Sequence, residues 1–96
     1  MNSLFAASIQ QQLNENGCKI SKQYIDELAD SAEAIFLHPT PRTRICILTL
    51  DTGHEVIGYA RVLDPKNDNE KIGNEVAFDN AKDELWALCG SIALAL

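Results

Sequence analysis

The sequence predicts an α+β fold in which two N-terminal helices precede a small antiparallel sheet and a long C-terminal helix packs on that sheet. Apolar residues recur at helical spacing before residue 34 and again after residue 69. Between them lie a β-branched run, a turn with a glycine and an alternating run, as in a β-hairpin. A lone hairpin is marginally stable, so we expect the last helix to stabilise it by packing on one face.

The chain has 96 residues, a hydrophobic fraction of 46% and a net charge of −6. Length and composition favour a single domain over residues 1–96 and a folded globule. No apolar run reaches the ~18 residues of a membrane span, and Lys and Arg are absent before Lys19, so no secretory leader is expected. We therefore expect a cytoplasmic protein. The acidic balance argues against binding to duplex nucleic acid, which needs a basic surface.

The first two helices are predicted from capping residues and apolar stripes. Ser3 is expected to cap the first helix, and Gly17 to follow its end at about residue 16, because glycine takes the left-handed conformation without strain. The apolar stripe of this helix is Phe5, Ile9 and Leu13. Ser21 is expected to cap the second helix, which should end between residues 30 and 34. Its stripe is Ile25, Leu28, Ala29 and Ala32.

A hairpin is predicted next. Residues 45–50 are continuous, apolar and β-branched, as in a buried strand, whereas Pro39 and Pro41 break any helix over residues 38–42. Residues 51–54 form the turn, with Gly53 at its positive φ. The partner strand is expected over residues 55–63. Alternation puts Val56, Gly58, Ala60 and Val62 on one face and Ile57, Tyr59, Arg61 and Leu63 on the other.

The third helix is expected to begin near Asn69, after a loop over residues 64–69, and to end at Cys89-Gly90. Its predicted buried stripe is Ala77, Ala81, Leu85 and Leu88, widened by Val76 and Phe78. Small residues at four-residue steps, Gly73, Ala77 and Ala81, would let its backbone approach the sheet closely. The apolar tail over residues 91–96 should be buried in this chain or in a neighbouring subunit. The tail and the small-residue stripe therefore favour a homo-oligomer.

The cysteines are predicted to be reduced thiols, because Cys18, Cys46 and Cys89 are odd in number and form no CxxC pair. Cys46 lies in the apolar run and is expected to be a small core residue. His38 and His54 stand at no zinc-binding spacing, so no metal site is expected. The chain contains no GxSxG, no phosphate-binding glycine loop and no HExxH. We therefore expect a protein that is not an enzyme and has no cofactor.

The stretch from Cys46 to Trp86 reads CILTLxxGxxVxGxxxxxDPxNxxxxIGxxxAxxNAxxxxW. This pattern resembles a family of small tailed-phage and prophage proteins of unknown function. Gly17, Ile20-Ser21 and Ile25 fit that family as well, so the resemblance covers nearly the whole chain.

The pattern is also similar to the first-type Thoeris anti-defence proteins of phages. This resemblance implies a protein in the host cytoplasm that binds a cyclic nucleotide-like signal, such as cyclised ADP-ribose or a cyclic oligonucleotide, without cleaving it. It also implies a homodimer or higher homo-oligomer with ligand sites near subunit contacts. Asp68 stands where the family has an aromatic residue, which argues against stacking on an adenine at that position.

Seven residues are candidates for binding such a ligand: His38, Arg42, Arg44, Tyr59, Arg61, Asn67 and Asn80. Arg42 and Arg44 lie beside His38 in the acid-free segment 34–50, where guanidinium forks could grip phosphates. Their aliphatic stems could instead only cover apolar surface. Tyr59 and Arg61 share a strand face, so they could meet a common ligand, or they could form a cross-strand pair or an oligomer contact.

Two amides complete the seven candidates, and Trp86 is considered beside them. Asn80 lies on the flank of the helix stripe and needs a hydrogen-bond partner, either in the hairpin backbone or in a ligand's ribose or base edge. Asn67 is expected to hold the loop before the helix and is also a candidate ligand contact. Trp86 is interpreted as a core anchor rather than a stacking platform.

The residues and the resemblance together predict a phage-encoded protein that sequesters a cyclic nucleotide signal. Two alternatives stay open. Residues 64–84 carry seven acids and three lysines, a charge that could mimic nucleic acid and inhibit a host nucleic-acid-binding defence complex, as anti-CRISPR proteins do. The chain could also be an accessory phage protein without a ligand.

Overall fold

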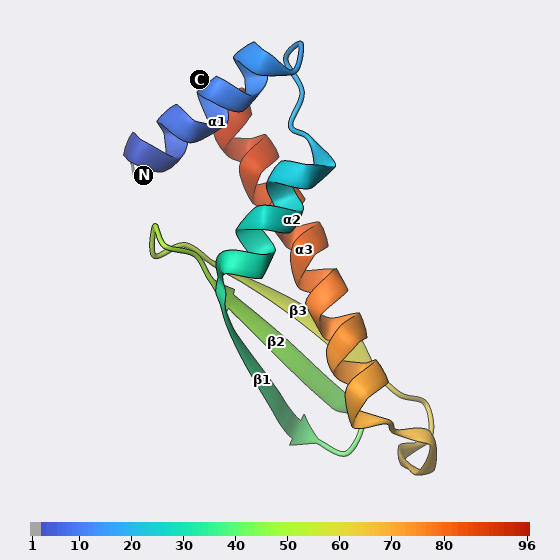
Figure 1. Ribbon diagram of the computed structural model, residues 1–96. Helices are drawn as coiled ribbons and strands as arrows, with labels where there is room; N and C mark the ends of the chain where they lie inside the picture. The colour runs from blue at the N-terminus through green and yellow to red at the C-terminus, as the bar shows by residue number, and fades with distance from the viewer. Residues whose placement is uncertain (1–2) are drawn as a thin grey trace.

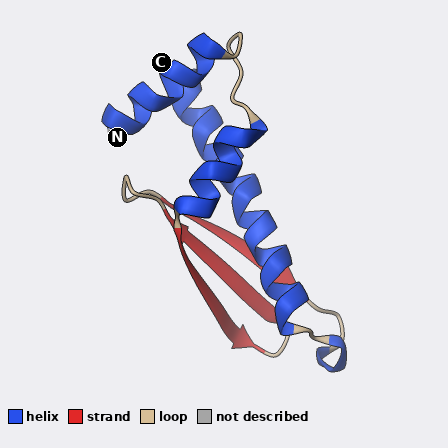
Figure 2. Ribbon diagram, in the orientation of Figure 1, coloured by secondary structure: helices blue, strands red, loops and turns tan. Residues whose placement is uncertain are grey.

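The computed structural model of the protein describes residues 3–96. Its elements are α1 (Ser3–Glu15), α2 (Lys22–Ser31), β1 (Glu33–Thr40), β2 (Thr43–Thr49), β3 (Glu55–Arg61), the 3-10 turn η1 (Pro65–Asn67) and α3 (Glu70–Leu94). The strands form one antiparallel sheet in the order β1-β2-β3. Helix α3 runs along one face of this sheet, and α1 and α2 pack against α3 (Figures 1 and 2). The predicted α+β architecture is confirmed.

Local signals set the ends of the first two helices. Gly17 follows α1 with a φ of 63°, and the amide of Cys18 closes the helix end by donating to the Leu13 carbonyl over 2.7 Å. Ser21 caps α2 as predicted, since its hydroxyl oxygen accepts a hydrogen bond from the Tyr24 amide at 3.1 Å. The side chain of Ser3, the predicted cap of α1, lies outside what the structure describes.

Strand β1 is absent from the predicted elements, and its surroundings explain why. Every residue of β1 is exposed, so its apolar run shows no alternation between a buried and an exposed face. Pro39 lies within it, which an edge strand tolerates because one row of its backbone groups has no partner strand. The pairing with β2 runs from Glu33 opposite Thr49 to Leu37 opposite Ile45 and becomes irregular beyond.

The helix-facing side of the sheet forms the core with α3. Cys46 and Leu48 of β2 and Val56 and Ala60 of β3 are buried there. The alternation predicted for β3 is confirmed, whereas the predicted continuous burial of residues 45–50 is only partly so, because Ile45 and Ile47 are half-buried. Gly58 lies between Val56 and Ala60, and a Cβ atom on it would overlap the backbone of α3 at Ala77 and Ala81. The predicted close approach of the small-residue stripe is therefore confirmed inside this chain.

The end of α3 differs from the prediction. The helix does not stop at Cys89-Gly90 but continues to Leu94. Cys89 and Ile92 continue the buried stripe, and α1 and α2 pack on the same helix. That burial outweighs the cost of a glycine inside a helix, about 1 kcal/mol. The apolar tail is thus buried in its own chain at Ile92, while Leu94 is 92% exposed.

Two further burial predictions are wrong. Val76 does not widen the buried stripe, because it is 44% exposed, and Trp86 is 39% exposed and therefore no core anchor. Both side chains lie on the part of α3 that faces away from the sheet, since Ala77, Ala81 and Leu85 occupy the buried side.

Candidate functional site

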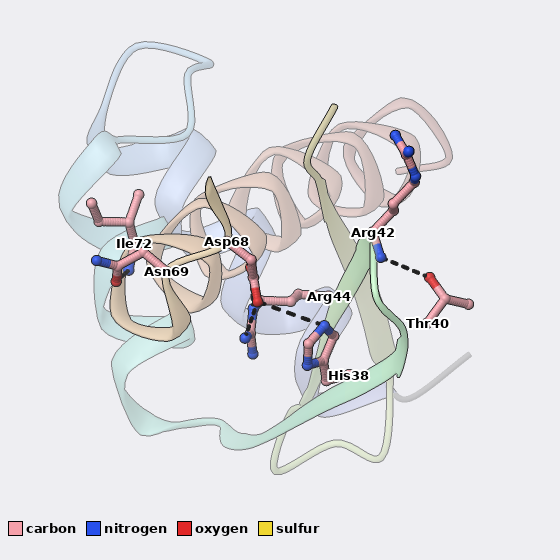
Figure 3. A network of polar contacts seen from close by, with 7 residues as sticks. All are labelled: His38, Thr40, Arg42, Arg44, Asp68, Asn69 and Ile72. Atoms are coloured by element: carbon pink, nitrogen blue, oxygen red, sulfur yellow. Dashed lines mark hydrogen bonds and ion pairs between the residues drawn. The ribbon is translucent and has the colours of Figure 1, made fainter. Parts of the chain in front are cut away.

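An ion pair links the sheet to the loop that leads into α3. The Arg44 guanidinium on β2 donates to Asp68 at two points, with Nε 3.0 Å from Oδ1 and Nη2 2.6 Å from Oδ2 (Figure 3). His38 of β1 reaches the same carboxylate, with Nε2 3.7 Å from Oδ2. The side chains of Arg44 and Asp68 are only 11% and 14% exposed. The hydrogen bonds from Arg44 hold the pKa of the Asp68 carboxyl below its usual value.

Gly73 makes room for this pair. A Cβ atom at Gly73 would overlap the Cδ of Arg44 and lie 2.9 Å from its Nε. The glycine on the first turns of α3 thus lets the arginine stem pass between helix and sheet. Asn69 fixes the start of the helix beside it, because its Oδ1 accepts from the Ile72 amide at 3.1 Å (Figure 3).

This pairing corrects the interpretation of the acid-free segment. Arg44 lacks an acidic neighbour in sequence, yet Asp68, 24 residues later, occupies its guanidinium fork. A phosphate would have to displace that carboxylate, so Arg44 is not a free phosphate-binding group. Local sequence carries no signal for the pair, since its members lie on separate elements that only the fold brings together. The one signal in the sequence at position 68 is that an aspartate stands where the resembling family has an aromatic residue.

Arg42 lies apart from this cluster. It stands at the exposed turn between β1 and β2, where its amide donates to the Thr40 hydroxyl at 3.3 Å. Its guanidinium donates through Nη1 to the Leu63 carbonyl. Figure 3 shows the Arg42 side chain directed away from Arg44 and His38. The two arginines therefore do not form one patch.

Tyr59 and Arg61 lie together on the sheet face opposite α3. The Arg61 Cζ is 5.5 Å from the centroid of the Tyr59 ring, a cation–π contact, and Tyr59 is 45% exposed. The prediction that these two residues share a strand face is confirmed. Both belong to β3, which within residues 3–96 pairs with a strand on its β2 side alone.

Asn80 of α3 lies at this outer side of β3. Its Nδ2 donates to the Tyr59 carbonyl over 2.6 Å. Of the two partners predicted for this side chain, the structure therefore shows the one in the hairpin backbone. The Val62 amide pairs inward with the Arg42 carbonyl, so alternation directs the carbonyl of Tyr59 outward. The backbone groups of Ile57 point to the same free edge by the same alternation.

A groove of about 720 Å³ runs along this edge. We call it the β3–α3 groove; it is lined by residues 55–59 of β3 and by Asn80, Glu84, Ala87, Leu88 and Ser91 of α3. Tyr59 and Asn80 thus meet at the groove through the hydrogen bond from Asn80 to the Tyr59 carbonyl, while the Tyr59 ring and Arg61 lie on the sheet face opposite α3. Two carboxylates, those of Glu55 and Glu84, also border the groove.

The seven predicted ligand residues therefore occupy four places. Tyr59, Arg61 and Asn80 gather at the free edge of β3, and His38 and Arg44 gather around Asp68. Arg42 stands at the turn between β1 and β2. Asn67 lies in η1, where its backbone N–H donates to the Asp64 carbonyl at 2.9 Å. The β3–α3 groove, which sequence reasoning did not assemble, also brings in Glu84 and Ser91. Sequence alone does not link these two residues of α3 to β3, because only the packing of the strand on the helix brings them together.

Other chemistry is limited in residues 3–96. There, no group of three or more His, Cys, Asp or Glu side chains is placed to hold a metal ion. Cys46 and Cys89 are buried thiols, and burial raises the pKa of both, that of Cys89 to about 11. None of the described helices is both long and apolar enough to cross a membrane.

Residues 10–94 match the sequence model of the Phage protein (N4 Gp49/phage Sf6 gene 66) family. No curated protein and no solved structure matches the chain.

Proposed function

Because the chain belongs to the N4 Gp49/phage Sf6 gene 66 family of phage proteins, we propose that it is a phage-encoded protein that binds a cyclic nucleotide signal and holds it without cleaving it. The proposed ligand is a cyclised ADP-ribose or a cyclic oligonucleotide. The observation that carries the proposal is the β3–α3 groove, which Tyr59 and Asn80 line, with Arg61 in contact with the Tyr59 ring at the same edge of the sheet. The family match confirms the resemblance to small phage proteins, and the likeness to Thoeris anti-defence proteins stays a prediction.

The groove offers groups that suit a nucleotide. Its volume falls in the range of about 300–1,000 Å³ typical of small-molecule sites. At the edge of β3 beside the groove, the ring of Tyr59 supplies an aromatic face for a base, and the Arg61 guanidinium supplies a bidentate partner for a phosphate. Carboxylates accept hydrogen bonds from ribose hydroxyls, so Glu84 suits the sugar. In this pose the phosphates lie toward Arg61, away from Glu84.

Sequestration demands tight binding rather than turnover. A dissociation constant of ~10 nM corresponds to about −11 kcal/mol of binding free energy. Charged hydrogen bonds contribute about 1.5–3 kcal/mol each, and base stacking on an aromatic side chain about 1–3 kcal/mol. We further propose that the protein acts as a homo-oligomer in the host cytoplasm, as its resemblance to the Thoeris anti-defence proteins implies.

The test is retention of ligand by the purified protein. We expect it to take up one member of a panel of cyclised ADP-ribose isomers and cyclic di- and trinucleotides, and to release that ligand intact after heating. Tyr59→Leu and Arg61→Gln should each weaken binding about tenfold or more, while Arg42→Gln, at the β1–β2 turn, should bind normally. If no panel member is retained, or if Arg42→Gln is affected as strongly as Arg61→Gln, the groove is not the site.

One observation favours the alternative of an acidic inhibitor. Glu75, Asp79 and Asp83 stand at four-residue steps on α3, and all three are exposed. Such a row of carboxylates resembles the charge of a nucleic-acid backbone and suits a basic groove on a host protein. Substituting all three by glutamine or asparagine would abolish that inhibition while leaving ligand retention unchanged. An accessory phage protein without a ligand would show neither ligand retention nor inhibition of a host nucleic-acid-binding complex.

A further inference from the structure

Strand β1 forms one border of the sheet, and within residues 3–96 its outer edge has no partner strand (Figure 1). Such an edge is a template for another extended chain, and proteins usually protect it with lysine, proline or a bulge. On β1 that protection is confined to the end, where Pro39 stands and the register with β2 becomes irregular. Residues 34–37 pair regularly with β2 and are apolar and exposed.

The pairing with β2 decides which backbone groups of β1 are free. The Val62 amide donates to the Arg42 carbonyl, so the even-numbered residues of β2 direct their backbone groups at β3. The odd-numbered residues of β2 therefore bond to β1, at Ile35 among others. By alternation, Ala34 and Phe36 direct their N–H and carbonyl groups outward. An extended peptide would pair with these groups.

A groove of about 610 Å³ lies beside this edge. We call it the β1–α3 groove; it is lined by Phe36 of β1 and by Lys71, Asn74, Glu75, Phe78 and Asp79 of α3. Every lining residue belongs to β1 or α3, so the groove borders the outer side of the sheet. Successive side chains of a strand point to opposite faces. Every second side chain of an added strand would therefore enter the groove.

Two carboxylates give the groove its charge. Glu75 and Asp79 are exposed, and within residues 3–96 neither takes part in an ion pair. They outnumber the ammonium group of Lys71, while Phe36 and Phe78 supply apolar walls. The groove therefore suits a side chain with an apolar stem and a cationic end, which lysine and arginine have.

The other face of β1 suits different side chains. Ile35 and Leu37 are 43% and 46% exposed there, and the remaining side chains of an added strand would lie next to them. Apolar side chains at those positions would form favourable cross-strand pairs. Strand β2 separates this border from Tyr59 and Arg61 of β3, so the surface does not overlap the proposed nucleotide contacts.

We propose that β1 and the β1–α3 groove bind an extended segment of a partner protein in which basic and apolar residues alternate. The segment adds a strand to the sheet beside β1, as in β-strand addition. Its basic side chains enter the groove toward the two carboxylates, and its apolar side chains cover Ile35 and Leu37. Backbone hydrogen bonds to Ala34 and Phe36 provide affinity, and the alternation provides specificity.

A second copy of this chain does not supply that segment. Residues 33–40 contain no lysine or arginine, so β1 of another copy would bring no cation to Glu75 and Asp79. The partner is therefore a different protein. The inference is independent of the proposed nucleotide, because β1 and the β3–α3 groove lie at opposite borders of the sheet.

The first experiment uses two fluorescein-labelled seven-residue peptides, one in which lysine alternates with valine and one with glutamate in place of lysine. We expect anisotropy titrations to show that the wild type binds the lysine peptide at least tenfold more tightly than the glutamate peptide. The two peptides share their valines, so the difference reports the charge of the groove. Equal binding of both peptides, or binding of neither, would overturn the proposal.

The second experiment tests the backbone edge with Ala34→Pro. Proline removes the outward N–H of residue 34 and leaves the ladder with β2 intact, so the circular dichroism spectrum should not change. The variant should bind the lysine peptide at least tenfold more weakly, whereas Ala34→Ser, which keeps the N–H, should stay within about threefold of the wild type. Light scattering should give both variants the mass of the wild type. Wild-type binding by Ala34→Pro would contradict strand addition, and a lower mass would assign the edge to a second copy.

The third experiment reverses the charge of the groove at exposed positions that folding tolerates. A variant with Glu75→Lys and Asp79→Lys should prefer the glutamate peptide, which inverts the order of the wild type. Asp83→Lys is the matched control, because Asp83 is an exposed carboxylate of α3 outside the groove, and it should keep that order. If the double variant also keeps the order, the groove is not the contact. These experiments use no nucleotide, so their failure is distinct from a failure of the proposed function.

Discussion

Gly58 of β3 lies directly against the backbone of α3 at Ala81, where a Cβ atom on the glycine would stand 2.8 Å from the Ala81 Cα. The carbonyl of Ala77 and the amide nitrogen of Ala81 would overlap that atom. Backbone on both sides leaves no flexible side chain to move away. This contact fixes the distance between the sheet and the helix, and with it the position of the β3–α3 groove.

Gly58→Ala should therefore destabilise the fold by about 1–3 kcal/mol or more, the usual range for overpacking a core. Gly90→Ala is the matched control, because Gly90 lies inside α3 with nothing within 4 Å of an added Cβ. That substitution should raise the free energy of unfolding by about 0.5–1 kcal/mol. Urea unfolding of the three proteins measures both changes. Equal stability of Gly58→Ala and the wild type would contradict the close packing.

Asp68→Asn should destabilise the protein at neutral pH and lose its effect in acid. The pKa of Asp68 is lowered in the folded state by the Arg44 hydrogen bonds. The ion pair therefore stabilises the fold above the unfolded carboxyl pKa, about 3.9, and this contribution is lost as the pH falls through the folded value. Unfolding curves of the wild type and the variant should differ at pH 7 and converge as the pH falls through the lowered pKa of folded Asp68. Asp79→Asn, which removes an exposed carboxylate of α3, should leave the pH 7 midpoint nearly unchanged.

Arg44→Ala should lower stability, whereas Arg42→Ala should leave it nearly unchanged. Arg44 holds Asp68 at two points and passes beneath α3, while Arg42 is exposed and lies at a turn. Melting curves, with Lys66→Ala as a surface control, compare the three variants. A ligand affinity that falls in Arg44→Ala far beyond its loss of stability would reinstate Arg44 as a phosphate-binding residue.

Native thiol labelling should modify one cysteine per chain. Cys18 is exposed, whereas Cys46 and Cys89 are buried, and burial raises the pKa of both buried thiols, that of Cys89 to about 11. The thiolate is the reactive form, so these two groups stay protonated and shielded at pH 8. Mass spectrometry after iodoacetamide should find one adduct in buffer and three in denaturant. Rapid labelling of Cys89 in buffer would show that the contact of α1 and α2 with α3 opens readily.

The features that could be predicted from sequence are those with local causes. Ser21 capping α2, Gly17 ending α1 and the alternation of β3 each depend on neighbours within a few residues. Strand β1 escaped prediction because both its faces are exposed and no alternation arises. The end of α3 was misplaced because Gly90 is a strong local signal, and packing by α1 and α2 overrides it.

The candidate site was predictable only in part, for the same physical reason. Tyr59 and Arg61 are two residues apart on one strand, so alternation alone joins them. The Arg44–Asp68 pair and the Asn80–Tyr59 hydrogen bond join residues 24 and 21 positions apart. Such pairs depend on how the hairpin docks on α3, which no local pattern encodes.

The bound nucleotide should come off chemically unchanged. Under the proposed function the protein acts by lowering the free concentration of its ligand, so the ligand is held and released without turnover. The carboxylates at the groove, Glu55 and Glu84, suit hydrogen bonds to sugar hydroxyls rather than attack on phosphorus. We therefore expect chromatography to show no new product after prolonged incubation with cyclised ADP-ribose or cyclic di- and trinucleotides, with or without added Mg²⁺ or Mn²⁺. Product that accumulates with time, and that Glu84→Gln abolishes, would make this protein an enzyme rather than a sequestering protein.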